Sequence, residues 1–374
     1  MDKLRTGVIG AGTVSQVMHL PNLCGMPDRF DLVGVFDPSP RVRGFVQDRF
    51  GVPAFSEVDA LLSAPLDAVV IASPDALHGE QVMAALAAGL HVFCEKPLAY
   101  GAGAIAEMIA ARDAADKVLQ VGYMKRFDPA YETLLDLLPA DGGQLMQVVV
   151  EVLDPDSGPF IGHHPGCNGN DLPERVGDEM RRKRRAQLAQ VFGGPLNDHV
   201  ARGFCGPFAS SIVHDVNAVH GLLDRLGLAT EEVVGAQFYA EGQGGHGTVR
   251  LGGGGLWMMS HLTVPDLPRY CERISLVFES VSFELVFPSP WLANVPTGLT
   301  VHGGGGERLH SETIRCGYAE PFEEQLKGFH AAVVDGAPVR NTAEAAARDM
   351  ALLKEMTLWQ LTREAEDTRN GAVA

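Results

Sequence analysis

The sequence predicts an α/β protein with two domains. A doubly wound parallel sheet at residues 1–124 precedes an α+β domain at residues 125–374, which is built on a large, mostly antiparallel open sheet. Three observations support this prediction. At roughly 150 residues per domain, a chain of 374 residues has room for two or three domains. Short apolar runs alternate with helical patterns in the first part of the chain, and strand patterns separated by glycines follow in the second.

Buried parallel strands are expected at residues 4–10, 31–36, 68–72, 91–94 and 118–122, because each is a short, nearly continuous apolar run. Helices are expected between them, at residues 77–88 and 102–115. The first consists of good helix formers, and the second has an apolar stripe. Alternating strands and helices are typical of a parallel sheet covered by helices on both faces.

The strands of the second domain are expected at residues 144–152, 232–240, 255–263, 272–279 and 281–287. Turns are expected at the GGGG sequences of residues 252–255 and 303–306. Few helical patterns separate these strands, so the sheet should be largely antiparallel. A final helix is expected to start at Asn341, with Glu344 three residues later, and to run to about Arg363; it could pack back on the first domain.

Composition and charge narrow the possible partners. The chain has 30 basic and 47 acidic residues and a net charge of −17, which disfavours nucleic acids and anionic membrane surfaces. The longest apolar runs are far shorter than the ~20 residues of a membrane-spanning helix. The N-terminal residues contain no apolar signal core, so we expect a cytoplasmic protein. Reduced thiols are expected because the cysteines form no C-x-x-C pair: they are Cys24, Cys94, Cys167, Cys205, Cys271 and Cys316.

More than fifty residues, 153–207, separate the first strand of the second domain from its main helix. Loops of this length are usually functional or disordered, and we expect this one to border the substrate site. Its basic run at residues 181–185 predicts a solvated helix face. No metal is predicted, because the adjacent His163 and His164, with Cys167 nearby, lack the i, i+4 spacing of helical ligands.

A dinucleotide-binding turn is predicted between the first strand and its helix. Gly10 allows the tight turn and Gly12 lets the backbone approach a pyrophosphate, with Thr13 and Val14 opening the helix. The third position of the fingerprint is Ser15 instead of glycine or alanine. Asp37 follows the second strand, where a carboxylate can bind the ribose hydroxyls and repel a 2′-phosphate. NAD is therefore favoured over NADP, although Arg41 lies nearby in the sequence.

Two further polar groups follow later strands. Ser73 and Pro74, with His78 shortly after them, follow one strand, and Glu95 and Lys96 follow the next. Ligands of open α/β sheets bind at the carboxyl ends of strands, so these residues are candidates for the site. Lys96 is a loop lysine between an acid and a proline, and we interpret it as functional.

The second domain contains a helical pattern at residues 208–227. Its apolar residues form one narrow stripe, and its opposite face has Ser210, His214, Asn217 and Gly221. A face exposed only to water would usually have lysine or glutamate. Small and hydrogen-bonding residues instead predict a closely fitting neighbour, either the other domain or a ligand. His214 is a candidate catalytic base, with a purely structural histidine as the alternative.

With these residues identified, the sequence resembles the Gfo/Idh/MocA oxidoreductases, the family of inositol dehydrogenase and glucose-fructose oxidoreductase. The resemblance rests on GVIGAGTVSQVMHLP, SPDALHGEQVMAAL, FCEKPLA and VGYMKRFDPAY, which cover nearly the whole first domain. It implies a Rossmann domain and an α/β domain whose open sheet packs against a partner subunit. It also implies a homo-oligomer and a nicotinamide cofactor between the domains.

By position, the resemblance assigns Lys96 as the active-site lysine and His214 as the catalytic histidine. Arg126 would lie near the nicotinamide, and Tyr270 would contact substrate. Two acids of related enzymes are replaced here. Ser210 and Asn217 stand in their places, and both are expected to contact substrate.

The expected function is NAD-dependent oxidation of a secondary alcohol in a sugar, cyclitol or glycoside, or the reverse reduction. His214 would take the hydroxyl proton and Lys96 would stabilise the alkoxide, although a desolvated Lys96 could itself be the base. Two alternatives remain. One is a hydrolase or lyase that oxidises its sugar transiently with NAD, and the other is a non-catalytic protein that senses sugars or nucleotides.

Overall fold

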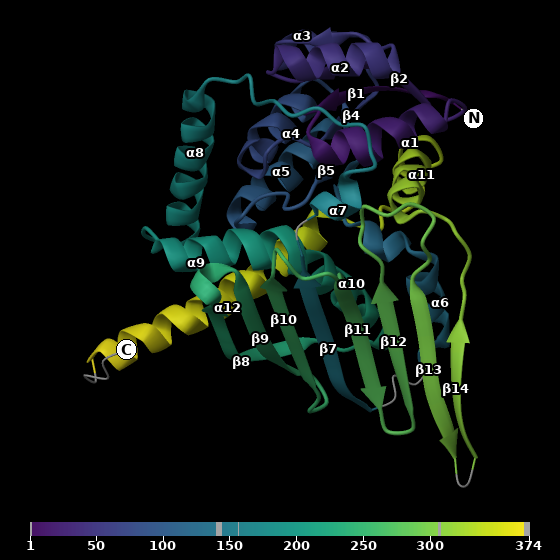
Figure 1. Cartoon of the computed structure of the whole chain (residues 1–374), viewed down its shortest axis with the longest axis vertical. Coiled ribbons are helices and arrows are strands. Elements are labelled where there is room, and N and C mark those ends of the chain that lie inside the picture. Colours follow the sequence, from purple (N-terminus) through teal and green to yellow (C-terminus); the bar gives the residue numbers. More distant parts are fainter. Residues whose placement is uncertain (1, 140–143, 156, 306–307, 370–374) are drawn as a thin grey trace. The chain divides into compact units, whose positions relative to one another are not determined.

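The computed structural model of the protein describes residues 2–139, 144–155, 157–305 and 308–369 (Figure 1). The chain divides into two compact units, and each is built from several segments. Unit 1 contains the described residues up to Met124 together with 161–195 and 322–348, and unit 2 contains the remainder. The predicted division at residue 124 therefore coincides with a boundary, but two segments beyond it belong to unit 1.

Unit 1 contains a six-stranded parallel sheet in the order β3-β2-β1-β4-β5-β6. The sheet confirms the predicted doubly wound fold, with β3 as an additional two-residue strand. The strands are β1 (Leu4–Ile9), β2 (Phe30–Phe36), β3 (Ala54–Phe55), β4 (Ala68–Ile71), β5 (His91–Glu95) and β6 (Leu119–Gly122). Strand β4 is buried along its whole length, as expected for a strand covered on both faces.

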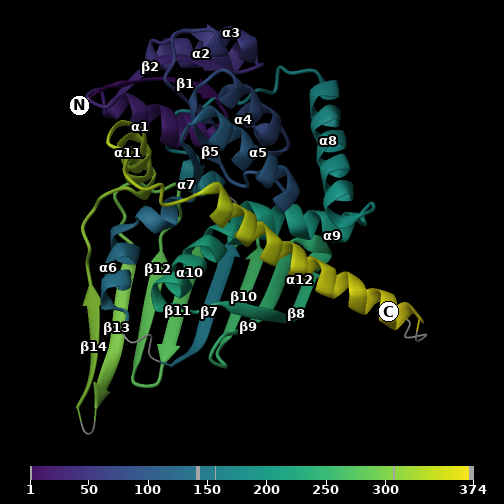
Figure 2. The same ribbon diagram turned by 180° about the vertical axis from the view of Figure 1, so that it is seen from behind.

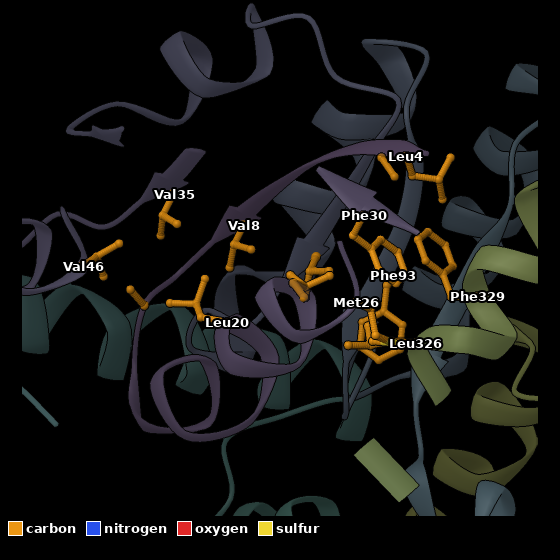
Figure 3. Packing of buried hydrophobic residues seen from close by; sticks show 14 of the residues in the cluster. Leu4, Val8, Leu20, Met26, Phe30, Val35, Val46, Phe93, Leu326 and Phe329 are labelled. Carbon is orange, nitrogen blue, oxygen red and sulfur yellow. The ribbon is translucent and has the colours of Figure 1, made fainter. Parts of the chain in front are cut away.

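The helices of unit 1 include one that the sequence analysis missed. This helix, α11 (Pro321–Val334), contributes Leu326 and Phe329 to the core around β1, β2 and β5 (Figure 3). Both side chains are fully buried, which is worth about 1.5–3 kcal/mol for each large apolar residue. The other helices are α1 (Leu20–Gly25), α2 (Pro40–Phe50), α3 (Val58–Leu62), α4 (His78–Ala87), α5 (Ala102–Ala115) and α8 (Glu174–Phe192).

Unit 2 contains an eight-stranded sheet in the order β14-β13-β12-β11-β7-β10-β9-β8. All neighbouring strands are antiparallel except β7 and β10, which confirms the mostly antiparallel prediction. The five predicted strands are β7 (Leu145–Asp154), β8 (Thr230–Tyr239), β10 (Leu256–Thr263), β11 (Cys271–Phe278) and β12 (Val281–Phe287). Three more were not predicted: β9 (Gly244–Leu251), β13 (Gly298–Gly305) and β14 (Arg308–Ile314). The prediction of a turn at residues 303–306 was wrong for Gly303–Gly305, because these residues belong to β13. At the other glycine sequence, Gly253 and Gly254 do form a turn with positive φ.

Helices α6 (Pro129–Leu137), α10 (Val213–Leu226) and α12 (Ala343–Arg369) lie over one face of this sheet (Figure 2). The predicted helix at 208–227 consists of α10 and the end of a π-helical segment, Phe204–Ile212, which follows α9 (Asp198–Gly203). Its whole apolar stripe is buried. A short helix, α7 (Gly158–Ile161), lies where the chain passes from unit 2 to unit 1.

Helix α12 begins two residues later than predicted, at Ala343, because Thr342 caps it. The Thr342 hydroxyl accepts the N–H of Ala345 at 3.2 Å, while the Asn341 side chain donates to the Tyr123 carbonyl at 2.6 Å. Residues 343–348 of this helix belong to unit 1 and the rest to unit 2. Across the part of the chain that the structure describes, no helix has the length and apolar character needed to cross a membrane.

Candidate active site

The turn after β1 is tight and leaves part of its backbone exposed. Gly10 has φ of +92°, and a Cβ atom at this position would lie 2.7 Å from the backbone of Ser73. Gly12 is exposed, and a Cβ atom there would meet nothing within 4 Å. Thr13 is exposed as well, at the start of the helical segment, and Val14 is half-buried. The backbone of Gly12 and Thr13 is therefore open to a ligand at a helix N-terminus, where phosphate groups bind favourably.

Ser15 occupies the third fingerprint position without disturbing the turn. Its buried hydroxyl donates to the Gly10 carbonyl at 2.5 Å, so the polar atom is satisfied inside the turn. The departure from glycine or alanine is thus accommodated locally, inside the turn.

Asp37 follows β2 and is nearly buried, with 9% exposure. One carboxylate oxygen accepts the N–H of Ala11 at 3.0 Å, and the other accepts the N–H of Ser39 at 2.9 Å. Burial raises the pKa of Asp37 above its usual value, although these two hydrogen bonds oppose the shift. A carboxylate has about four lone-pair sites, so these two hydrogen bonds leave acceptor sites on Asp37 for further donors.

Lys96 is half-buried, and its loop is fixed by a buried carboxylate. One oxygen of Glu95 lies 2.9 Å from Nε2 of His19, and the other accepts the backbone N–H of Lys96 at 3.2 Å. Burial would raise the pKa of Glu95, but the hydrogen bond and charge of His19 lower it below the usual value. Glu95 is only 6% exposed, so the geometry gives it the role of positioning Lys96 instead of the expected contact with the cofactor.

His78 connects the loop after β4 with the loop after β5. Its Nδ1 lies 2.8 Å from the Pro97 carbonyl, and its Nε2 lies 2.9 Å from the Ser73 carbonyl. With 1% exposure, His78 holds these loops together and has almost no surface left for a cofactor. Ser73 is half-buried and donates to Gln81 at 2.5 Å, whereas Pro74 is exposed.

Part of the long insert lies in unit 1, beside the proposed cofactor site. The side-chain amide of Gln16 donates to the Cys167 carbonyl and accepts the Cys167 N–H, both at 2.8 Å. Asp171 accepts the Ser39 hydroxyl at 2.5 Å and the N–H of Arg41 at 3.1 Å. We call residues 166–171 the strap. These contacts associate this part of the insert with the turn after β1 and the loop after β2. That the insert borders the substrate site stays a prediction.

The basic run lies on α8 and is only partly the solvated face that was expected. Arg181, Arg182 and Arg185 are exposed. Lys183 and Arg184 instead form ion pairs with carboxylates of unit 1, Glu80 and Asp75, both at 2.7 Å. Two of the five basic residues therefore attach α8 to the rest of unit 1.

The second group of candidate residues lies in unit 2, around α10. Ser210 is exposed and His214 is half-buried, so both have surface available to a ligand. Asn217 is fully buried, and its amide donates to Asp349 at 2.7 Å. His220, one turn further along the helix, lies 2.6 Å from the other oxygen of Asp349. Asn217 therefore joins α10 to α12, a geometry that leaves it no surface for the expected contact with substrate.

Gly221 explains the close-fitting neighbour predicted from the small residues of this helix. A Cβ atom on Gly221 would lie 2.3 Å from the Tyr131 hydroxyl and 2.8 Å from Nε of Arg126. At Gly221, the neighbour is therefore a pair of side chains from the same unit. Arg126, which was expected near the nicotinamide, is half-buried with its guanidinium beside this helix.

A buried ionic cluster in unit 2 was not identified from the sequence. Lys125 donates to Asp215 at 2.6 Å and also to Glu272, and Glu272 accepts the hydroxyl of Tyr270 at 2.8 Å. Burial and the nearby charge of Glu272 raise the pKa of Asp215 to about 8, against the opposing effect of Lys125. Two carboxyl groups thus share one ammonium, and one of them retains a proton at neutral pH. Tyr270, the expected substrate contact, is half-buried and part of this cluster.

The residues considered as metal ligands do not converge. His163 and His164 lie with their ring centroids 4.0 Å apart, and the Cys167 thiol is directed to backbone carbonyls. Among the described residues, no group of three or more histidine, cysteine, aspartate or glutamate side chains could hold a metal ion. All six cysteines are free thiols.

Solved structures resemble this fold over almost its whole length. UDP-N-acetylglucosamine 3-dehydrogenase from Acidithiobacillus ferrooxidans has a TM-score of 0.71 and 20% identity, covering 96% of this chain and 98% of that one. A 3-ketoreductase from Actinomadura kijaniata, in complex with NADP and TDP-benzene, has a TM-score of 0.69 and 20% identity, covering 94% of this chain and 96% of that one. Identities this low show a shared fold alone.

Sequence relatives match mainly the first part of the chain. Inositol 2-dehydrogenase from Corynebacterium glutamicum is 32% identical over 149 residues, which are 39% of this chain and 44% of that protein. The match thus spans less than half the length of that curated relative. Residues 4–123 also match the family model GFO_IDH_MocA, described as an oxidoreductase family with an NAD-binding Rossmann fold. Residues 4–123, which include the turn after β1 and the loop of Lys96, are therefore similar to this oxidoreductase family.

Proposed function

We propose that this protein is an NAD-dependent oxidoreductase that converts a secondary alcohol of a sugar, cyclitol or glycoside to a ketone, or catalyses the reverse reaction. One observation carries the proposal. Unit 1 presents an open phosphate-binding turn, and the same unit holds the loop of Lys96 in place through Glu95 and His78. The relatives named inositol 2-dehydrogenase and UDP-N-acetylglucosamine 3-dehydrogenase support the choice of a polyhydroxylated substrate.

Gly10, Gly12, Thr13 and Val14 would hold the pyrophosphate of NAD, and Asp37 would bind its adenosine ribose. When bound, NAD supplies the hydride acceptor for oxidation and the hydride donor for reduction. NAD is proposed over NADP because the carboxylate of Asp37 lies at the end of β2.

His214 and Lys96 would act on the same substrate oxygen. In the oxidation, the His214 imidazole takes the hydroxyl proton as general base. Lys96 donates a hydrogen bond to that oxygen, and its positive charge stabilises the alkoxide as it forms. Ser210, exposed one turn before His214, would donate a hydrogen bond to another hydroxyl of the substrate.

A screen of sugars, cyclitols and glycosides for NADH formation tests the proposal. Net formation of NADH also distinguishes a dehydrogenase from a hydrolase or lyase, because such an enzyme would return the hydride to its own intermediate and accumulate no NADH. With the best substrate, His214→Ala should lower kcat by about 10² to 10⁴, the usual contribution of a positioned base. A general base acts in its unprotonated form, so wild-type oxidation should rise with pH, and His214→Ala should abolish this rise. Lys96→Met should lower kcat but leave that rise visible in the residual activity.

Lys3→Ala and His310→Ala are the controls, because they remove an exposed lysine and an exposed histidine elsewhere in the chain. Both variants should keep wild-type kinetics. If the His214 variant keeps the pH dependence and the Lys96 variant loses it, lysine is the base and the two roles are reversed. Tight NAD binding without turnover of any substrate in the screen would favour a sensor over an enzyme.

A further inference from the structure

We propose that Asp171 selects NAD against NADP. Its carboxylate takes the position of an anion at the loop after β2, where the 2′-phosphate of NADP would need to bind. The inference rests on the proposed function, because it concerns the dinucleotide site of unit 1. It assigns a specificity-determining role to the long insert, far from the fingerprint in the sequence.

The first line of evidence is the N-terminus of α2. Ser39 is the N-cap of this eleven-residue helix, and its side chain accepts the N–H of Val42. A hydroxyl and free N–H groups at a helix start are the groups that usually bind a phosphate. In this structure Asp171 already uses them, because it accepts both the Ser39 hydroxyl at 2.5 Å and the Arg41 N–H at 3.1 Å.

The second line of evidence is the guanidinium of Arg41. An arginine at this position commonly accommodates the 2′-phosphate of NADP. Here the guanidinium donates to the side-chain oxygen of Asn170 at 2.8 Å, next to Asp171. The strap therefore engages both the cation and the helix N-terminus that a 2′-phosphate would otherwise use.

The strap is fixed at two further points. Upstream of Asp171, the paired hydrogen bonds between Gln16 and Cys167 attach it to the helical segment after the phosphate-binding turn. Gly169 lies so close to Ser39 that a Cβ atom would come within 3.3 Å of the Ser39 Cβ. With these two contacts upstream and its own hydrogen bonds to Ser39 and Arg41, the carboxylate of Asp171 is held at the start of α2.

The charges around this position favour a neutral 2′-hydroxyl. Asp37 lies in the same loop, and the charge of Asp171 adds to burial in raising the pKa of Asp37, so the two carboxyl groups lie close enough to interact. A 2′-phosphate would place roughly two more negative charges beside these two carboxyl groups. A ribose hydroxyl instead can donate a hydrogen bond to a carboxylate.

Calorimetric titration of the full chain with NAD and with NADP tests the inference. Asp171→Asn keeps the size of the side chain and removes its charge, and Asp171→Ala removes the carboxylate altogether. Both variants should bind NADP at least about tenfold more tightly than the wild type does, which corresponds to about 1.4 kcal/mol. Their affinity for NAD should change less than about threefold. The gain should be smaller at high salt, because Asp171 is exposed and its charge is screened.

Asp178→Asn is the matched control. Asp178 lies seven positions later in the same insert, is exposed, and pairs with Arg181 on α8. The Asp178→Asn variant removes the same charge at a position outside the strap, so the ratio of NAD affinity to NADP affinity should stay unchanged. An equal gain in NADP affinity in this control would overturn the inference by showing that net charge alone matters.

The outcomes separate the inference from the proposed function. If the wild type binds NAD and the Asp171 variants keep its ratio of affinities, the inference fails and the dinucleotide site stands. A wild type that prefers NADP also overturns it. If the wild type binds neither dinucleotide, the proposed function itself fails, and this inference fails with it. Circular dichroism of the variants confirms that they fold.

Discussion

Asp37 combines a structural and a proposed functional role in one side chain. Its two hydrogen bonds, to Ala11 and Ser39, join the turn after β1 to the loop after β2. The same carboxylate is the proposed ligand of the ribose hydroxyls. A charged hydrogen bond of this kind contributes about 1.5–3 kcal/mol, so replacing Asp37 should be measurable in cofactor binding.

Asp37→Ala should therefore weaken NAD binding by about 10- to 100-fold, as 1.4 kcal/mol is a factor of ten. NADP binding should weaken much less, because the variant also removes a charge that repels the 2′-phosphate. Titration with both cofactors measures the two losses, and Asp48→Asn on the exposed side of α2 is the charge control. Equal losses for the two cofactors would contradict the assignment.

At the level of single residues, the sequence was informative where a short motif determines the local geometry. Gly10, Gly12 and Lys96 were identified because a strand end and a turn define their positions. The cluster of Lys125, Asp215 and Glu272 was not, because its members are separated by 90 and 57 positions and meet only through the fold of unit 2. No local pattern distinguishes them from surface charges.

At the level of elements, apolar runs and strand patterns predicted most strands, whereas the glycine-rich β9 and β13 and the mostly exposed β14 were missed. Strand β9 begins with Gly244, Gly245 and Gly247, residue types that are depleted in strands. Glycine is needed at these positions because side chains from distant parts of the chain pack against the strand. A Cβ atom on Gly245 would lie 2.9 Å from Phe208, and one on Gly247 would lie 2.6 Å from the sulfur of Met356. Helix α11 did offer a signal, because Leu326, Phe329 and Val333 have helical spacing.

Because α10 packs closely against α6 at Gly221, we expect that a larger residue there destabilises the fold. Gly221→Ala places a methyl group against the hydroxyl of Tyr131, which donates to the Ala218 carbonyl at 2.8 Å. Overpacking of this kind costs about 1–3 kcal/mol, so the free energy of unfolding should fall by that amount. Gly103→Ala on α5 is the control, because a Cβ atom there meets nothing within 4 Å.

The control should stabilise its helix by up to about 1 kcal/mol, since alanine is the better helix former. Denaturant unfolding followed by circular dichroism measures both variants. A Gly221→Ala protein as stable as the wild type would show that Tyr131 and Arg126 move aside at no cost.

At the level of the whole molecule, the sequence could not predict how the chain is shared between the units. Each unit is assembled from three separate segments of the chain, and α12 contributes to both. The strand and helix patterns are local, whereas this division depends on contacts between residues hundreds of positions apart. One example is the ion pair of Arg112 with Glu344 in unit 1, at 2.8 Å.

The buried cluster around Lys125 also affects the stability of the whole molecule. The pKa of Asp215 is raised to about 8 in the folded protein by burial and by the nearby charge of Glu272, against the opposing effect of Lys125. An aspartate in the unfolded chain loses its proton near pH 4. Between about pH 4 and pH 8 the folded state therefore binds the extra proton, and the free energy of unfolding must fall as the pH rises. One bound proton corresponds to a slope of at most about 1.4 kcal/mol per pH unit.

Asp215→Asn should remove this slope, because it leaves one carboxylate, Glu272, for the ammonium of Lys125. The stability of the variant relative to the wild type should rise steadily from about pH 4 to about pH 8, as measured by denaturant unfolding at several pH values. Glu272→Gln should have the same effect for the same reason, while Asp136→Asn, an exposed charge on α6, should not. A stability difference between the Asp215 variant and the wild type that is constant over this range would show that the cluster does not retain the proton, since only a group that titrates differently in the folded and unfolded states produces a slope.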